Sequence, residues 1–125
     1  MITVFVPYLG PSLNEIYSGI HYRTRSRSAK TAHWITKIAV REMKPIKNPV
    51  RITFRPVLGK GTVTRDCSNY AYAAKMIEDG LVRAGVIKDD TPEFVKSITI
   101  IAPVRDRKRG NGMFLDIEEI QKSGH

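Results

Sequence analysis

Cysteine is nearly absent from this sequence, with Cys67 the only one among 125 residues. A disulfide within the chain needs two cysteines, and a cysteine-based zinc site needs several. Both features are therefore excluded, as is the class of small secreted domains held together by disulfides. We expect a protein of the reducing cytoplasm.

Long apolar runs are also missing. No stretch approaches the roughly 20 residues that a membrane-spanning helix needs. The start of the chain, Met1-Ile2-Thr3-Val4-Phe5-Val6-Pro7, has no basic run and too short an apolar stretch for a signal peptide. The hydrophobic content of 42% and charged content of 26% exclude the disordered and fibrous classes. A chain of 125 residues predicts one domain over 1–125, without a membrane segment.

Acidic residues are the scarcer charge, 12 against 21 Lys and Arg, which gives a net charge of +9. A sequence pI near 9.9 is typical of proteins that bind nucleic acid, although a basic surface can also serve solubility alone. The basic residues gather in three segments, 22–30, 55–65 and 105–109, each of which we expect to lie in a loop between ordered elements. Polyanions are the partners that this distribution favours.

The pattern of apolar residues predicts an α+β fold in one domain. Alternation and β-branched runs indicate strands at 2–6, 49–58, 95–103 and 113–117, whereas helical spacing indicates helices at 28–43 and 68–84. The segment 7–27 reads as a long loop, and Gly85 stands where a left-handed helix cap is expected. The turn at 110–112 would join the last two strands in a hairpin. The order β-α-β-α-β-β predicts a mixed sheet of about four strands with two helices packed on it.

The second predicted helix carries a polar stripe with acidic residues at both ends. At about 100° per residue, Ser68, Tyr72, Lys75 and Asp79 fall within an arc of about 60°. The opposite side collects apolar residues that pack on the sheet, namely Tyr70, Ala74, Ile77, Leu81 and Ala84. Asp66 precedes the stripe, and Asp89 and Asp90 follow it.

Phosphodiester hydrolysis needs hard cations to activate water and to stabilise charge on the leaving oxygen. Mg²⁺ prefers oxygen ligands and needs only a few carboxylates, and a lysine beside it can hold the phosphate. Simpler roles stay open: Asp66 as a helix cap, Lys75 and Asp79 as an exposed pair, Asp89 and Asp90 as turn formers. The remaining candidates are weaker. His21 and His33 are isolated in sequence, Cys67 has no pairing histidine, and Trp34 is expected in the core.

These residues resemble a known family. The run Arg65-Asp66-Cys67-Ser68-Asn69, then Lys75, then Asp79-Gly80-Leu81 and Gly85 with Asp89-Asp90, is similar to the signature of RusA-type Holliday-junction resolvases, many of them encoded by phages or prophages. Pro11-Ser12-Leu13-Asn14 also resembles the family's opening loop. In order, the match covers nearly the whole chain.

The resemblance implies a homodimer that nicks four-way DNA junctions in symmetric pairs with Mg²⁺ or Mn²⁺, during recombination or repair. Asp66 would be the first metal-binding aspartate and Asp90 the last, with Asp79 and Asp89 at adjoining acidic positions. Lys75 would be the helix lysine, and with Asp66 and Asp90 it forms the expected catalytic set. The residues expected to contact DNA are Arg23, Arg25, Arg27, Lys30, Lys60, Arg65, Asn69, Arg105, Arg107, Lys108 and Arg109.

Ser68 departs from the family pattern, because an aspartate usually stands there. Asp79 or a water then compensates, or metal binding is weaker. The alternative function is a branched-DNA-binding protein with little or no catalysis, and a third is an RNA- or protein-binding domain.

Overall fold

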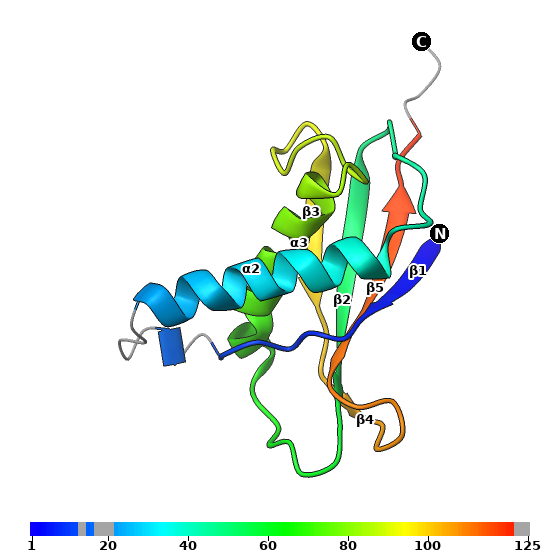
Figure 1. Cartoon of the computed structure of the whole chain (residues 1–125). Helices are drawn as coiled ribbons and strands as arrows, with labels where there is room; N and C mark the ends of the chain where they lie inside the picture. The colour runs from blue at the N-terminus through cyan, green and yellow to red at the C-terminus, as the bar shows by residue number, and fades with distance from the viewer. Residues whose placement is uncertain (13–14, 17–21, 122–125) are drawn as a thin grey trace.

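The computed structural model describes residues 1–12, 15–16 and 22–121 of the chain (Figure 1). The elements, in chain order, are β1 (Ile2–Val6), α2 (Tyr22–Ala39), β2 (Val50–Leu58), the 3₁₀ turn η1 (Cys67–Tyr70), α3 (Ala71–Arg83), β3 (Val95–Ile100), β4 (Val104–Arg105) and β5 (Gly112–Glu119). The predicted α+β class, with two helices on a mixed sheet, is confirmed. The sheet has five strands because the short β4 joins it.

The sheet order is β1-β5-β2-β3, with β4 also paired to β2. β5 runs antiparallel to both β1 and β2, whereas β3 runs parallel to β2 after the crossover through α3. The predicted hairpin between the last two strands was therefore wrong. A glycine-rich turn shows that the chain reverses, but it does not fix which strand the returning segment pairs with. Met113, Leu115 and Ile117 are buried, which suits a strand in the middle of the sheet.

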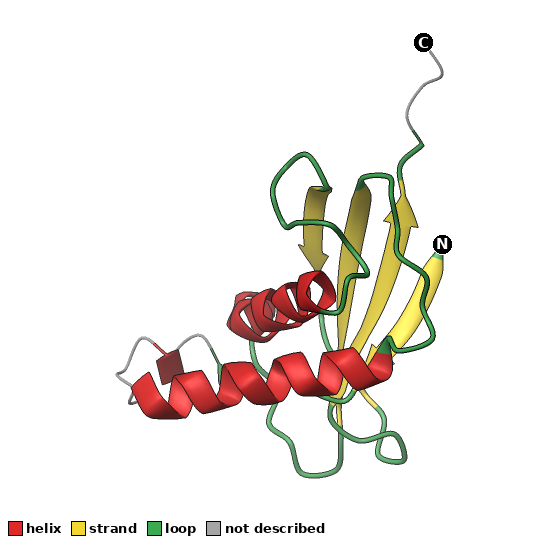
Figure 2. Cartoon of the chain, turned by 45° about the horizontal axis from the view of Figure 1, so that its top comes forward, coloured by secondary structure: helices red, strands yellow, loops and turns green. Residues whose placement is uncertain are grey.

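Both helices cover the same face of the sheet (Figure 2). The predicted alternation along β2 is confirmed, since Ile52 and Phe54 are buried and Arg51 is exposed. The apolar side of α3 meets them with Ile77 and Leu81, both fully buried. Burial of apolar surface at about 25 cal/mol per Å² makes this single helix-to-sheet core the main source of stability. No helix in the described ranges is long and apolar enough to cross a membrane.

The predicted boundaries of the first helix were wrong. α2 begins at Tyr22 rather than at residue 28, so the basic stretch expected as a loop is helical. Ser28 therefore lies within the helix, and its hydroxyl shares a 2.6 Å hydrogen bond with the Tyr8 hydroxyl. Trp34 was expected in the core, but it is 63% exposed. A single tryptophan raises the apolar count of a helix on whichever side it stands, so composition did not reveal its outward position.

The second helix also begins later than predicted. Residues Cys67–Tyr70 form a 3₁₀ turn, and α3 starts at Ala71. A 3₁₀ turn advances the chain by about 120° per residue rather than 100°, so Ser68 does not keep the phase assumed for the polar stripe. Gly85 has φ +78°, as expected for a left-handed helix end.

Helices α2 and α3 approach each other closely at Gly80. A Cβ added there would lie 2.7 Å from the Cβ of Thr36 on α2. Because real Cβ atoms do not come so close, only glycine allows this separation. The contact brings the outward-facing residues of the two helices onto one surface.

Candidate metal centre and its basic surroundings

Three carboxylates converge beside α3. Glu78 and Asp79 come from the helix and Asp90 from the loop that follows it, and one carboxylate oxygen of each lies within 4.8 Å of those of the other two. Asp79 and Asp90 were predicted site residues. Glu78 was not, because its place next to Ile77 on the helix puts it towards the core, where a carboxylate is unexpected.

The ammonium of Lys75 lies among these carboxylates. Its Nζ is 2.6 Å from Asp90 Oδ2, 3.2 Å from Glu78 Oε1 and 3.3 Å from Asp79 Oδ1. Asp79 and Glu78 are the i+4 and i+3 neighbours of Lys75 on α3, so helical geometry alone explains those two contacts. Asp90 comes from the loop after the helix, so its contact with Lys75 depends on the tertiary fold. The group is therefore not explained as an exposed i,i+4 pair alone.

The three acidic groups and the lysine differ in how readily they ionise. The hydrogen bond from Lys75 lowers the pKa of Asp90, and this bond is also the largest cause of the raised pKa of Lys75. Glu78 behaves in the opposite way, because burial raises its pKa more than Lys75 lowers it. Its side chain is only 4% exposed. Lys75 therefore stays charged at neutral pH, and Glu78 is a poorer anion than a surface glutamate.

The donor types fit a hard divalent cation. Oxygens that bind one Mg²⁺ at about 2.1 Å are at most about 4.2 Å apart. The present oxygens lie within 4.8 Å of one another, so the carboxylates would have to come closer to bind one ion together. The ammonium competes for the same oxygens, so a cation would have to displace it. Lys75 can move, because its side chain is 51% exposed.

The other predicted acidic residues lie at the edges of this group or outside it. Asp89 accepts a 2.8 Å hydrogen bond from the backbone N–H of Asp90, as turn-forming aspartates do. It also lines an open hollow of about 300 Å³ with Asp79, Asp90, Val82 and Arg83. Asp66 is exposed at the start of η1, and its side chain makes no capping hydrogen bond there. Neither residue is among the three converging carboxylates, so the metal role of Asp66 stays a prediction.

Three of the predicted DNA-contact arginines have partners within the protein. Arg105 lies in β4 rather than in a loop, and it donates hydrogen bonds of 2.6 and 2.7 Å to the carbonyl oxygens of Gly59 and Thr62 in the loop after β2. The guanidinium of Arg109 stacks 5.0 and 4.8 Å from the ring centroids of Phe5 and Phe114.

Arg65 donates to the Gly10 carbonyl and lies over the Tyr70 ring. Asn69 is half-buried, and its backbone N–H donates to the Asp66 carbonyl. Arg65, Arg105 and Arg109 thus have structural roles that sequence could not show.

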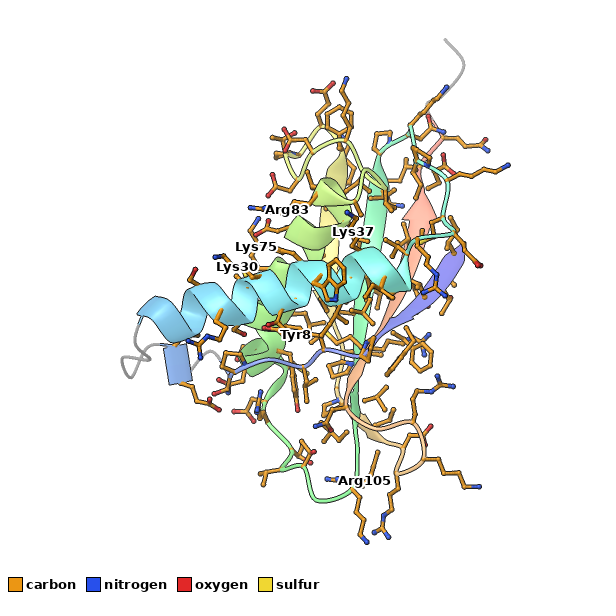
Figure 3. The ribbon with its side chains drawn as sticks, viewed as in Figure 1. Tyr8, Lys30, Lys37, Lys75, Arg83 and Arg105 are labelled. Atoms are coloured by element: carbon orange, nitrogen blue, oxygen red, sulfur yellow. The ribbon has the colours of Figure 1, made fainter. Side chains whose placement is uncertain are left out.

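The remaining predicted contacts are outward-facing. Lys60, Arg107 and Lys108 are exposed in the two loops at the end of the sheet, and Arg27 and Lys30 are exposed on α2. Figure 3 shows Lys30 and Lys75 at the helices and Arg105 far from them, near β4. The side chains of Arg23 and Arg25 lie outside the part of the structure that is described. The basic surface is therefore divided between the helical layer and the loops at one end of the sheet.

No protein-family model matches the chain, and no curated protein is similar to it.

Proposed function

We propose that this chain is a Mg²⁺-dependent endonuclease acting on branched DNA, with four-way junctions as the substrate class that the RusA resemblance implies. The observation that carries the proposal is the convergence of Glu78, Asp79 and Asp90 on the Lys75 ammonium. A charge of +9 on a chain of 125 residues supports a polyanionic partner.

Each residue of the group has a chemical task in this proposal. Asp79 and Asp90 supply anionic oxygens for the cation, which when bound activates water and stabilises charge on the leaving oxygen. Glu78 holds the group to the core, because its carboxylate is buried. Lys75 has three donors and a half-exposed side chain, so after losing its carboxylate partners it can bind the phosphate.

The assembly and location that fit this function are also proposals. A four-way junction presents two equivalent strands, which a homodimer with two-fold symmetry would meet with two identical sites. The exposed Lys60, Arg107 and Lys108 would contact phosphates outside the site, where contacts fix position rather than sequence. A cytoplasmic location belongs to the same proposal.

A second candidate is a protein that binds branched DNA with little or no cleavage. Two observations favour it. Lys75 already satisfies all three carboxylates, so the group can serve as a structural ion-pair network. Ser68 is exposed and supplies no carboxylate where the resembled family usually has one.

Incubating a labelled four-way junction with the protein, with and without MgCl₂, separates the two candidates. We expect nicking only with the metal, and we expect Asp79→Asn and Asp90→Asn each to abolish nicking while junction binding remains. Asp66→Asn tests the aspartate that the resemblance adds. Glu42→Gln is the matched control, because Glu42 is an exposed carboxylate outside the group. A shift of the junction without nicking at any Mg²⁺ or Mn²⁺ concentration would select the binding protein.

A further inference from the structure

The outer face of α2 carries an exposed tryptophan between two lysines. Trp34 is 63% exposed, and Lys30 and Lys37 are exposed as well. The lysines stand four residues before and three residues after Trp34, a spacing that places all three on one side of a helix. The indole therefore lies in a strip of positive charge.

A second helix completes a hollow around this strip. Lys30, His33, Trp34 and Lys37 from α2, with Arg83 and Ala84 from α3, line a space of about 290 Å³. Its lining includes three cationic side chains and no carboxylate. Lys30, Lys37 and Arg83 are labelled in Figure 3 on the two packed helices, on the same side of the molecule as Lys75.

This hollow adjoins the carboxylate group. Arg83 lines both this hollow and the one formed with Asp79, Asp89 and Asp90. Burial is the main cause of the lowered pKa of His33. Arg83 adds to this lowering and Asp79 opposes it, so the His33 ring interacts electrostatically with residues that line both hollows. A nucleic-acid strand bound in this hollow and running past Arg83 would reach the carboxylates.

The chemistry of the lining matches a nucleotide. Aromatic side chains bind single-stranded nucleic acid by stacking on bases, while cations beside them neutralise the phosphates. A base within a duplex has neighbours on both faces, so the indole can stack only on a base that is unpaired or at a strand end. An isolated exposed tryptophan would need no explanation. This one has three cations around it and the candidate metal centre beside it.

We infer that the hollow is a binding site for an unpaired nucleotide of single-stranded DNA, whose base stacks on Trp34 and whose phosphates contact Lys30, Lys37 and Arg83. This site rests on the proposed function, which it narrows: the preferred substrate has a single-stranded segment next to the scissile phosphate. A splayed junction, a flap or a gap has such a segment, and a continuous duplex lacks it.

Trp34 is the sole tryptophan of the sequence, so its fluorescence reports on this site directly. We would titrate the protein with a short oligothymidylate in EDTA, which prevents cleavage. The expected result is saturable quenching by the single strand and several-fold weaker quenching by a blunt duplex. Binding of a dye-labelled oligothymidylate, followed by anisotropy, should weaken about tenfold or more in Trp34→Ala. Trp34→Phe should recover most of this loss, because it keeps an aromatic face.

The cationic half of the site has its own test. Replacing Lys30, Lys37 and Arg83 by glutamine should reduce the slope of log affinity against log salt by about 2, at about 0.7 per phosphate contact for single strands. The matched control replaces three exposed lysines that do not line this hollow, Lys44, Lys47 and Lys96, and should change the slope less.

Three results would overturn the assignment: binding of the oligonucleotide without quenching, unchanged binding by Trp34→Ala, or equal quenching by the duplex. Tighter binding of the matching RNA would assign the hollow to RNA instead. The readout in EDTA is independent of catalysis. Quenching in EDTA without nicking in Mg²⁺ would therefore support this site and refute the nuclease. Nicking in Mg²⁺ without quenching in EDTA would support the nuclease and refute this site.

Discussion

Replacing Lys75 by methionine tests whether the carboxylate group is built around a cation. Methionine keeps most of the apolar stem and is a good helix former, so the change removes chiefly the ammonium. Glu78 then loses its hydrogen-bond partner while it stays buried. Asp79 and Asp90 lose their partner too and are left facing each other and Glu78.

The expected destabilisation follows from the exposure of each carboxylate. A hydrogen bond to a charged group contributes about 1.5–3 kcal/mol, which applies to Glu78. Asp79 and Asp90 are about one-third exposed, and pairs of that kind contribute about 0.2–1 kcal/mol each. Glu78 can limit the loss by taking up a proton. We therefore expect the free energy of unfolding to fall by about 2 kcal/mol at neutral pH.

The loss should depend on pH in a defined direction. The pKa of Asp90 is lowered by Lys75, so that pair stabilises the wild type fully above the ordinary pKa of an aspartate, and the stabilisation is lost as pH falls through the lowered pKa. Without Lys75 the already raised pKa of Glu78 should rise further, and the variant should lose stability as pH rises through that value. Both effects increase the difference in the free energy of unfolding between wild type and variant as pH rises from acidic to neutral.

Urea unfolding of both proteins, at several pH values and with or without MgCl₂, measures these quantities. Mg²⁺ at ten times its Kd should stabilise the variant by about 1.4 kcal/mol, and the wild type less, because there it must displace the ammonium. Equal ionic strength of NaCl is the control. A variant as stable as the wild type, or one that responds equally to both salts, would refute a cation-centred group.

Three further predictions concern other parts of the molecule. Gly80→Ala should lower the free energy of unfolding by about 1 kcal/mol, because overpacking against Thr36 costs about 1–3 kcal/mol and the gain in helix propensity is only about 1 kcal/mol. Thermal unfolding measures this loss, and Thr36→Gly in the same protein should reduce it. A Gly80→Ala variant more stable than the wild type would contradict the close contact. Arg107→Gln with Lys108→Gln should lower the salt slope of junction binding by about 1.8, at about 0.9 per phosphate, and an unchanged slope would place the DNA elsewhere. Ser68→Asp should leave the Mg²⁺ concentration that gives half-maximal nicking unchanged, because position 68 lies in η1 and outside the three converging carboxylates, and a lower concentration would place the metal at η1 instead.

Strands and helices were predictable wherever burial follows a regular period. The alternation of Ile52 and Phe54 with charged neighbours identified β2, and Ile77 and Leu81 identified the buried side of α3. Pairing was not predictable in the same way, because the residues that make β5 a good strand are equally compatible with β3 or β2 beside it. Trp34 was misplaced because apolar character alone was taken as a sign of burial.

The candidate site was predictable in part. Asp79 and Lys75 share a helix, so their spacing alone places them together, and Asp90 follows the same helix after a short turn. Glu78 was missed because a buried carboxylate violates the rule that identified the rest of the helix. The internal partners of Arg105 and Arg109 depend on loops that meet only in the folded chain, which no local pattern encodes.

The position of β5 between β1 and β2 constrains the order in which the chain can fold. Ile2 of β1 pairs with Ile117 of β5, so the first strand finds its partner only after most of the chain has been synthesised. Until then β1 and one edge of β2 have open backbone hydrogen-bonding groups, and the loop that must close is nearly as long as the domain. Such long-range pairing slows folding and leaves strands open to association with other chains. A nascent chain halted before Gly112 would lack the strand that joins the two halves of the sheet, and we expect it to depend on chaperones.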